Sequence, residues 1–204
     1  MNTSNLQTIA DWSTDLLKFG SSCRRLAASK LPVNLYGARA HLQRRAATLL
    51  HGTVDVSSAW EELDGNSLAD DERGDRTSLL LGGATGGVAL TPATQSRGLL
   101  ATAGGGTLYL TNLERMSTAA QRVLCRIFET GRYTPVGDPF PRTINCRLII
   151  ATRKPLIVLA REFRVDWNLA HMLGQTSISA EKVLSALGAE DFLHSHPSHF
   201  AAAS

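Results

Sequence analysis

The sequence is poor in cysteine and in aromatic residues, and it has no long apolar run. Its three cysteines, Cys23, Cys125 and Cys146, are odd in number and lack C-x-x-C spacing, so we expect reduced, buried thiols and no metal site. No apolar stretch approaches the roughly 20 residues that a membrane helix needs. The N-terminus lacks the charged start and apolar core of a signal peptide. A cytoplasmic protein without a membrane partner is therefore expected.

The excess of basic over acidic residues is small. The net charge is +3 and the pI is near 9.0. Two arginine pairs, Arg24-Arg25 and Arg44-Arg45, fall on expected helices, where basic side chains usually face water. Direct binding to DNA is not expected from these features.

The composition fits one globular domain. With 204 residues, of which 43% are hydrophobic, the chain is long enough to bury a single core. We expect a helical segment at 1–30, an α/β domain at 31–192 and a flexible tail at 193–204.

Apolar strands alternate with amphipathic stretches, which predicts a parallel sheet covered by helices. Strands are expected at 32–36 and 53–57, and helices at 5–19 and 40–50. The acidic segment Glu61–Arg76 contains glycine and asparagine and is expected to be a mobile surface segment.

The stretch from Gly104 to Asn112 is an apolar strand that follows three glycines and ends in two polar residues. P-loop ATPases present an Asp-Glu pair to magnesium and to the attacking water at the end of such a strand. Here the pair is Thr111-Asn112, and neither side chain carries the negative charge that a hard divalent cation requires. The strand is therefore interpreted as an NTPase element without its catalytic groups.

The sequence after this strand resembles one family. Residues 121–152 read QRVLCRIFETGRYTPVGDPFPRTINCRLIIAT. Without a gap, they resemble the AAA+ domain of the bacterial enhancer-binding proteins, the sigma-54-dependent transcription activators. The resemblance implies a three-layer α/β fold, with a parallel sheet and helices on both faces, like the AAA+ (P-loop NTPase) α/β subdomain. The helical lid of that family is expected to be mostly missing, with at most a remnant between Ala180 and Phe192.

The nucleotide-binding elements that the resemblance implies are degenerate. The family's G-E-S-G-T-G-K-E loop falls on Gly37 to Arg44, where only the first glycine is kept. Leu42 takes the place of the last glycine and Gln43 that of the lysine, while Arg153 replaces the sensor asparagine. The sequence therefore predicts no ATPase activity and no cofactor.

Two arginines of this region leave phosphate binding open as an alternative. Either Arg39 or Arg44 carries a guanidinium that can replace lysine as a phosphate partner, although neither stands at the matching position. The alternative interpretation is that both are solvated helix charges. The Cβ atoms added at Ala40 and Leu42 are expected to favour a continuous helix and to close the anion site.

Two further segments bear on assembly and on sigma-54. The run Phe163-Arg164-Val165-Asp166 resembles the family's F-R-E-D, which makes Arg164 a candidate arginine finger acting in trans. The family's G-A-F-T-G-A loop, which contacts sigma-54, is replaced here by a segment with leucine for the aromatic residue and proline for a glycine. The candidate sigma-contacting residues are Ala89, Leu90, Thr91, Pro92 and Ala93.

A kept scaffold with replaced catalytic groups favours a non-catalytic regulator of sigma-54-dependent transcription. Such a chain would bind an authentic sigma-54 activator, or its own kind, through inherited ring interfaces. One alternative is a ligand sensor that binds a nucleotide or signalling dinucleotide through Arg39, Arg44 or Arg153. Another is a structural, self-associating interaction protein. The fold alone does not choose among them.

Overall fold

The computed structural model describes residues 21, 22, 25, 26, 29, 31–52, 58–85 and 97–195. The helix expected at 5–19, the strand expected at 53–57 and the candidate sigma-contacting residues Ala89–Ala93 lie outside the described residues.

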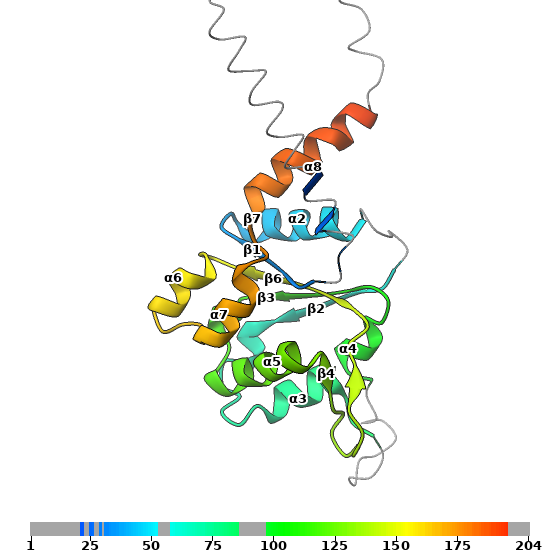
Figure 1. Cartoon of the computed structure of the whole chain (residues 1–204), viewed down its shortest axis with the longest axis vertical. Coiled ribbons are helices and arrows are strands. Elements are labelled where there is room, and N and C mark those ends of the chain that lie inside the picture. The colour runs from blue at the N-terminus through cyan, green and yellow to red at the C-terminus, as the bar shows by residue number, and fades with distance from the viewer. Residues whose placement is uncertain are drawn as a thin grey trace, which may run out of the picture.

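A five-stranded parallel sheet forms the centre of the domain (Figure 1). Its strands are β1 (Val33–Tyr36), β2 (Trp60–Asp64), β3 (Thr107–Thr111), β6 (Arg147–Thr152) and β7 (Ser177–Ser179). The strand order is β2-β3-β6-β1-β7, so the connection from β1 to β2 passes over β6 and β3, and the connection from β6 to β7 passes over β1. The carboxyl ends of all five strands lie along one edge of the sheet.

Helices cover both faces of this sheet. One face carries α2 (Ala40–Gly52) and α8 (Ala180–Ser195). The other face carries α3 (Asp75–Gly82), α4 (Leu99–Thr102), α5 (Thr118–Thr130), α6 (Leu156–Arg161) and α7 (Trp167–Gly174). Two 3-10 turns, η1 (Gly65–Leu68) and η3 (Leu113–Arg115), and a small hairpin of β4 (Arg132–Tyr133) and β5 (Arg142–Thr143) complete the described part. The three-layer α/β architecture is confirmed.

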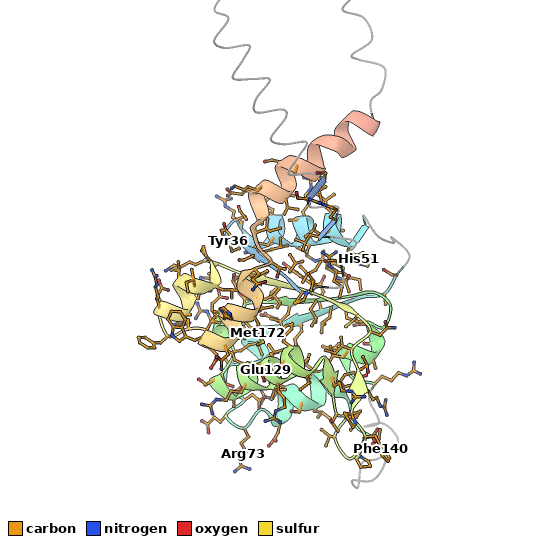
Figure 2. All side chains as sticks on the ribbon, in the orientation of Figure 1. Tyr36, His51, Arg73, Glu129, Phe140 and Met172 are labelled. Carbon is orange, nitrogen blue, oxygen red and sulfur yellow. The ribbon has the colours of Figure 1, made fainter. Side chains whose placement is uncertain are left out.

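The alternation of side chains along the strands explains the two layers. On β3, Leu108 and Leu110 are buried against the five-helix face, whereas Tyr109 between them is buried against α2 and α8. On β6, Leu148 and Ile149 divide in the same way. Successive residues of a strand point to opposite faces, so a strand that is apolar at every position is buried on both. Figure 2 shows side chains between the sheet and the helices on both of its faces.

The segment Glu61–Arg76 is not the surface loop that its composition predicts. It contains most of β2, all of η1 and the first two residues of α3. Leu63 and Leu68 are buried in the core, and Asp71 is buried as well. The Asp71 carboxylate accepts hydrogen bonds from the Thr77 amide (2.8 Å) and hydroxyl (2.5 Å). The acidic residue therefore caps a helix instead of facing water.

The residues from Ala180 onward do not form a lid remnant over the carboxyl edge. α8 continues past residue 192, where the domain was expected to end, to Ser195. Its residues Ala180, Val183 and Leu187 are buried against α2 and the sheet. Their spacing of three and four places them on one face of the helix. This helix is therefore part of the outer layer.

Two of the three cysteines are described, and both are free thiols. Cys125 is buried on α5, and Cys146, just before β6, is half-buried. Burial raises the pKa of each thiol to about 11. Among the described residues, no helix is long and apolar enough to cross a membrane.

Candidate functional site

The turn between β1 and α2 stands where the phosphate loop is expected. Gly37 and Ala38 both have positive φ values, of 74° and 60°, so the chain turns sharply after β1. The helix α2 begins at once, and the amides of Leu42 and Gln43 donate to the carbonyl of Arg39 at 2.9 and 3.0 Å. Two backbone N–H groups that a phosphate loop directs at its ligand are thus used inside the helix.

The side chain of Gln43 fills the turn itself. Its Nε2 atom donates to the carbonyl of Gly37 and to the carbonyl of Thr152, both at 2.7 Å. Gln43 is buried, with 7% of its surface exposed. Gln43, the residue that the resemblance aligns with the family's lysine, therefore connects the turn to the end of β6, and its amide donates to backbone carbonyls of the protein itself.

Arg44 is engaged with the neighbouring strand. Its Nη2 atom lies 2.7 Å from Glu62 Oε1, which also accepts from the Trp60 indole at 2.6 Å. Burial alone would raise the pKa of Glu62, but the hydrogen bonds from Arg44 and Trp60 outweigh it and lower that pKa. Arg39 is exposed. Of the two arginines proposed as phosphate partners, Arg44 is held by a carboxylate.

A carboxylate stands beside Thr111 and Asn112 at the end of β3. Asp64, at the end of β2, accepts from Asn112 Nδ2 at 2.8 Å and from Thr111 Oγ1 at 3.4 Å. It also accepts from the Asn66 amide at 3.0 Å. Burial opposes ionisation of Asp64, but these hydrogen bonds prevail and lower its pKa. No motif in the sequence predicts this contact, which lies at the carboxyl edge because Asp64 is in parallel register with Thr111.

The network around Asp64 is closed on itself. Its oxygens already accept from backbone and amide donors, and Asn112 holds a left-handed φ of 52°. Within the described ranges, no group of three His, Cys, Asp or Glu side chains is placed to hold a metal ion. The arrangement joins β2 to β3 by polar contacts where an NTPase of this fold holds its magnesium.

The sensor position and the finger residue both meet Glu114 on η3. The backbone amide of Arg153 donates to Glu114 Oε1 at 3.3 Å. The Nε atom of Arg164 lies 3.4 Å from the carbonyl oxygen of Glu114. Arg153 and Arg164 are exposed, whereas Glu114 is 6% exposed. Glu114 belongs to none of the motifs that the sequence offers.

The turn that carries Arg164 is fixed by Gln121 of α5. The side chain of Gln121 donates to the Arg164 carbonyl at 2.9 Å and accepts from the Asp166 amide at 2.8 Å. Phe163 adopts a left-handed φ of 56°, and 92% of its surface is exposed. Trp167 is also exposed, at 51%. A rigid turn therefore presents an arginine between two exposed aromatic rings.

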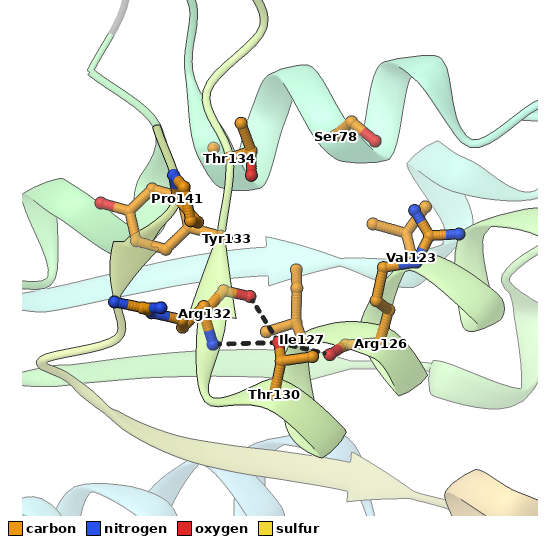
Figure 3. A pocket seen from close by; sticks show the side chains of 10 residues that line it. Ser78, Val123, Arg126, Ile127, Thr130, Arg132, Tyr133, Thr134 and Pro141 are labelled. Carbon is orange, nitrogen blue, oxygen red and sulfur yellow. Dashed lines mark hydrogen bonds between the residues drawn. The ribbon is translucent and has the colours of Figure 1, made fainter. Parts of the chain in front are cut away.

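A separate pocket of about 340 Å³ lies between α3, α5 and the β4–β5 hairpin (Figure 3). Ile127 and Tyr133 form part of its apolar wall, and Arg126 and Arg132 line it as well. Thr130 Oγ1 joins the helix to the hairpin, because it donates to the Arg126 carbonyl at 2.8 Å and accepts from the Arg132 amide at 3.2 Å. Scattered residues build this pocket, and no motif in the sequence predicts it.

The sheet order and the turn between β1 and α2 define an α/β domain of the AAA+ P-loop NTPase class. Within that class, the model of the Sigma-54 interaction domain matches residues 13–179. The chain belongs to this family, as the resemblance at 121–152 predicts.

Curated relatives are similar to this chain over part of their length. The nitric oxide reductase transcription regulator NorR2 of Cupriavidus necator is 30% identical over 170 residues, which are 82% of this chain and 28% of that protein. The DNA-binding transcriptional regulator NtrC of Azospirillum brasilense is 40% identical over 81 residues, which are 38% of this chain and 17% of that protein. The chain thus spans less than a third of the length of each of these relatives.

Two solved structures show the shared fold. NtrX from Brucella abortus in complex with ATP superposes with a TM-score of 0.65 at 16% identity, over 86% of this chain and 42% of that one. The P-loop NTPase domain of the Sigma-54 transport activator from E. coli superposes with a TM-score of 0.51 at 17% identity, over 83% of this chain and 94% of that one.

Proposed function

We propose that this chain is a non-catalytic regulator of sigma-54-dependent transcription. It acts by binding an active sigma-54 activator, or a second copy of itself, through the surface formed by Phe163, Arg164 and Trp167. We call this surface the finger face. Membership of the Sigma-54 interaction domain family supports a role in sigma-54-dependent transcription.

The observation that carries the non-catalytic part is the closed turn around Gln43. A hydrogen bond to a charged group contributes about 1.5–3 kcal/mol, so replacing lysine by glutamine weakens a phosphate contact by about 10- to 100-fold. Here the Gln43 amide also binds the loop's own carbonyl and that of Thr152. Nucleotide entry would have to break both bonds. Asp64 and Asn112 bond each other at the second element of the site.

The binding of a partner protein is supported by a difference between two surfaces. The β1–α2 turn is filled by the Gln43 side chain, whereas the finger face exposes its side chains. Gln121 holds the turn through two backbone hydrogen bonds, although Phe163 and Arg164 are exposed. Aromatic residues and arginines that become buried at a protein interface contribute strongly to binding, and contiguous exposed apolar patches mark such interfaces. The finger face therefore fits a protein partner in which Arg164 approaches a neighbouring nucleotide.

The test measures ATP hydrolysis by a sigma-54 activator from the same cell while the purified chain is added in increasing amounts. We expect a dose-dependent change in rate and co-elution of the two proteins. The variants R164A and F163A should remove both effects, whereas R161A, a change of another exposed arginine on α6, should keep them. Absence of co-elution together with an unchanged rate would reject the proposal, and ATP turnover by the chain alone would reject its non-catalytic part.

Self-association is the second candidate, and one observation favours it. Ile157, Phe163 and Trp167 are 49%, 92% and 51% exposed and belong to the consecutive elements α6 and α7 and the turn between them. Burying these side chains between copies would remove apolar surface from water. Light scattering after size exclusion should then show a mass that rises with concentration and falls to the monomer in F163D. A monomer at all concentrations would exclude this candidate.

The hypothesis of a ligand sensor that binds a nucleotide or dinucleotide through Arg39, Arg44 or Arg153 has weaker support. Arg44, one of its three arginines, is paired with Glu62, and Gln43 occupies the turn. Arg153 remains exposed at the end of β6.

A further inference from the structure

The pocket between α3, α5 and the β4–β5 hairpin has a fixed apolar floor (Figure 3). Ile127 and Tyr133 are 6% and 8% exposed, so the core beneath holds both side chains in place. Thr130 Oγ1 bonds backbone groups of α5 and of β4. Helix α3 approaches the hairpin so closely that a Cβ atom at Gly82 would lie 3.1 Å from the Thr134 carbonyl oxygen. The walls are therefore preorganised, which lowers the cost of binding a ligand.

The charged side chains of this pocket are all cationic. Arg126 of α5 and Arg132 of β4 line it, and none of the described aspartates and glutamates does. Both arginine side chains are exposed, and their guanidinium groups make no hydrogen bond or ion pair with any described residue. A carboxylate that enters the pocket would therefore meet unpaired donors and no like charge, so the pocket favours an anion.

The positions of the two arginines favour an anion with two charged ends. Arg126 belongs to the α5 side of the pocket and Arg132 to the hairpin side, and their guanidinium groups point in different directions in Figure 3. A small inorganic anion on one of them would leave the other unpaired and the apolar floor uncovered. A molecule with an anionic group at each end and an apolar middle would contact both guanidinium groups and cover the floor.

We propose that this pocket binds a small organic dicarboxylate with an apolar body. One carboxylate lies on Arg126 and the other on Arg132, and the hydrocarbon between them packs on Val123, Ile127 and Tyr133. A carboxylate suits a guanidinium group because its two oxygens accept from two parallel N–H donors. The pocket volume of about 340 Å³ falls within the range of about 300–1,000 Å³ that is typical of small-molecule sites.

This site is separate from the finger face and from the β1–α2 turn, because none of its lining residues belongs to either. One chain supplies every group, so the site needs no partner protein. The proposal therefore goes beyond the regulator function and does not rest on it. A bound dicarboxylate would join α3, α5 and the hairpin, and it would stabilise the folded chain as any ligand of the native state does.

The test is calorimetric titration of the purified full chain, at neutral pH, with octanedioate, octanoate and butanedioate. Octanoate has the same chain length with a single carboxylate, and butanedioate has two carboxylates with little apolar body. We expect octanedioate to bind about two- to fivefold more tightly than octanoate, because that is the value of a favourable exposed ion pair. Butanedioate should bind at least about tenfold more weakly than octanedioate, because most of the methylene groups that cover the floor are missing.

Two variants locate the carboxylates. R126A and R132A should each lower the affinity for octanedioate to that of octanoate. Each should leave binding of octanoate nearly unchanged, because one arginine remains for its single carboxylate. Both changes affect exposed side chains, so the variants should melt as the natural chain does in the absence of ligand.

R122A is the matched control. It removes another exposed arginine of α5 that does not line the pocket, and it should bind octanedioate as the natural chain does. An equal loss of affinity in R122A and R126A would indicate general attraction to a basic surface and overturn the site. Equal binding of octanedioate and octanoate would overturn recognition at two ends. Absence of octanedioate binding would overturn the proposal as a whole.

Discussion

The side-chain amide of Gln43 and the backbone carbonyl of Thr152 are 2.7 Å apart, although 109 positions separate the two residues in the sequence. This contact connects the first turn of α2 to the last residue of β6. Thr152 in turn donates through its hydroxyl to Asn34 Oδ1 at 3.1 Å, which joins β6 to β1. Gln43, which the resemblance aligns with the family's lysine, is therefore part of the sheet's own hydrogen-bond network.

The variant Q43L should be less stable than the natural chain. Leucine keeps the volume but removes two hydrogen bonds and leaves the Gly37 carbonyl without this donor, which costs about 1–3 kcal/mol. The melting temperature should fall by about 2–4 °C per kcal/mol in a domain of this size. R45A, which changes an exposed residue of the same helix, should melt as the natural chain does. An unchanged melting temperature in Q43L would show that the amide contributes nothing to stability.

The capping carboxylate Asp71 should make stability depend on pH. Burial raises its pKa, but hydrogen bonds from Thr77, Arg76 and Gly74 outweigh burial and lower it. A lowered pKa means that the ionised carboxylate stabilises the fold above its unfolded value of about 3.9, and that this stabilisation is lost as the pH falls through the folded value.

The variant D71N should therefore differ most from the natural chain near pH 7. Urea unfolding should show a loss of about 0.5–2 kcal/mol there, which is typical of a lost helix cap, and the difference should shrink below about pH 4. E72Q changes the adjacent exposed carboxylate and should not reproduce this behaviour. A difference that is constant from pH 3 to pH 7 would contradict the role of the ionised group.

Local patterns in the sequence predict the strands and helices well where apolar residues and fixed motif positions agree. The expected helix at 40–50 is α2, and the expected strand at 32–36 is β1. The prediction of a mobile surface segment at Glu61–Arg76 is wrong. An acidic residue such as Asp71 is expected to face water, but in the structure it is buried. The buried Asp71 carboxylate is stabilised by backbone and hydroxyl donors such as those of Thr77, and these donors reach it only once α3 has formed.

The site contacts were harder to predict, because they join residues that are distant in the sequence. The sequence places Thr111-Asn112 at the end of an apolar strand, but the Asp64 carboxylate that accepts from Asn112 lies 48 positions away in the sequence. Glu114 likewise stands in no motif, and its significance depends on Arg153 and Arg164 arriving from other elements. Arg164 could be named as a candidate arginine finger because a run of four consecutive residues, 163–166, carries the resemblance. Its role as a finger stays a prediction.

The two described cysteines should react slowly with alkylating reagents. Burial raises the pKa of Cys125 and Cys146 to about 11, and the reactive species is the thiolate. At pH 7 the thiolate fraction is on the order of 10 to the power 7 − 11, or one in ten thousand. In the C23S background, iodoacetamide labelling of the folded chain should be slow at pH 7 and should accelerate about tenfold per pH unit up to pH 10. Rapid labelling at pH 7 that is lost in C125S or C146S would contradict burial of that thiol.

Phe163 should separate stability from partner binding. Its φ of 56° lies in the left-handed region, which costs a side chain about 1–2 kcal/mol, and its ring is 92% exposed. Glycine adopts this conformation freely but loses about 0.5–1 kcal/mol through its more flexible unfolded chain.

The variant F163G should therefore be as stable as the natural chain or up to about 1 kcal/mol more stable, as measured by urea unfolding. It should nevertheless lose its effect on the ATPase rate of a sigma-54 activator, because the aromatic ring of the finger face is gone. E162G changes the preceding residue, whose φ of −83° glycine does not favour, and should lower stability instead. A marked loss of stability in F163G would show that the ring supports the fold, and a retained effect on the activator would remove Phe163 from the docking surface.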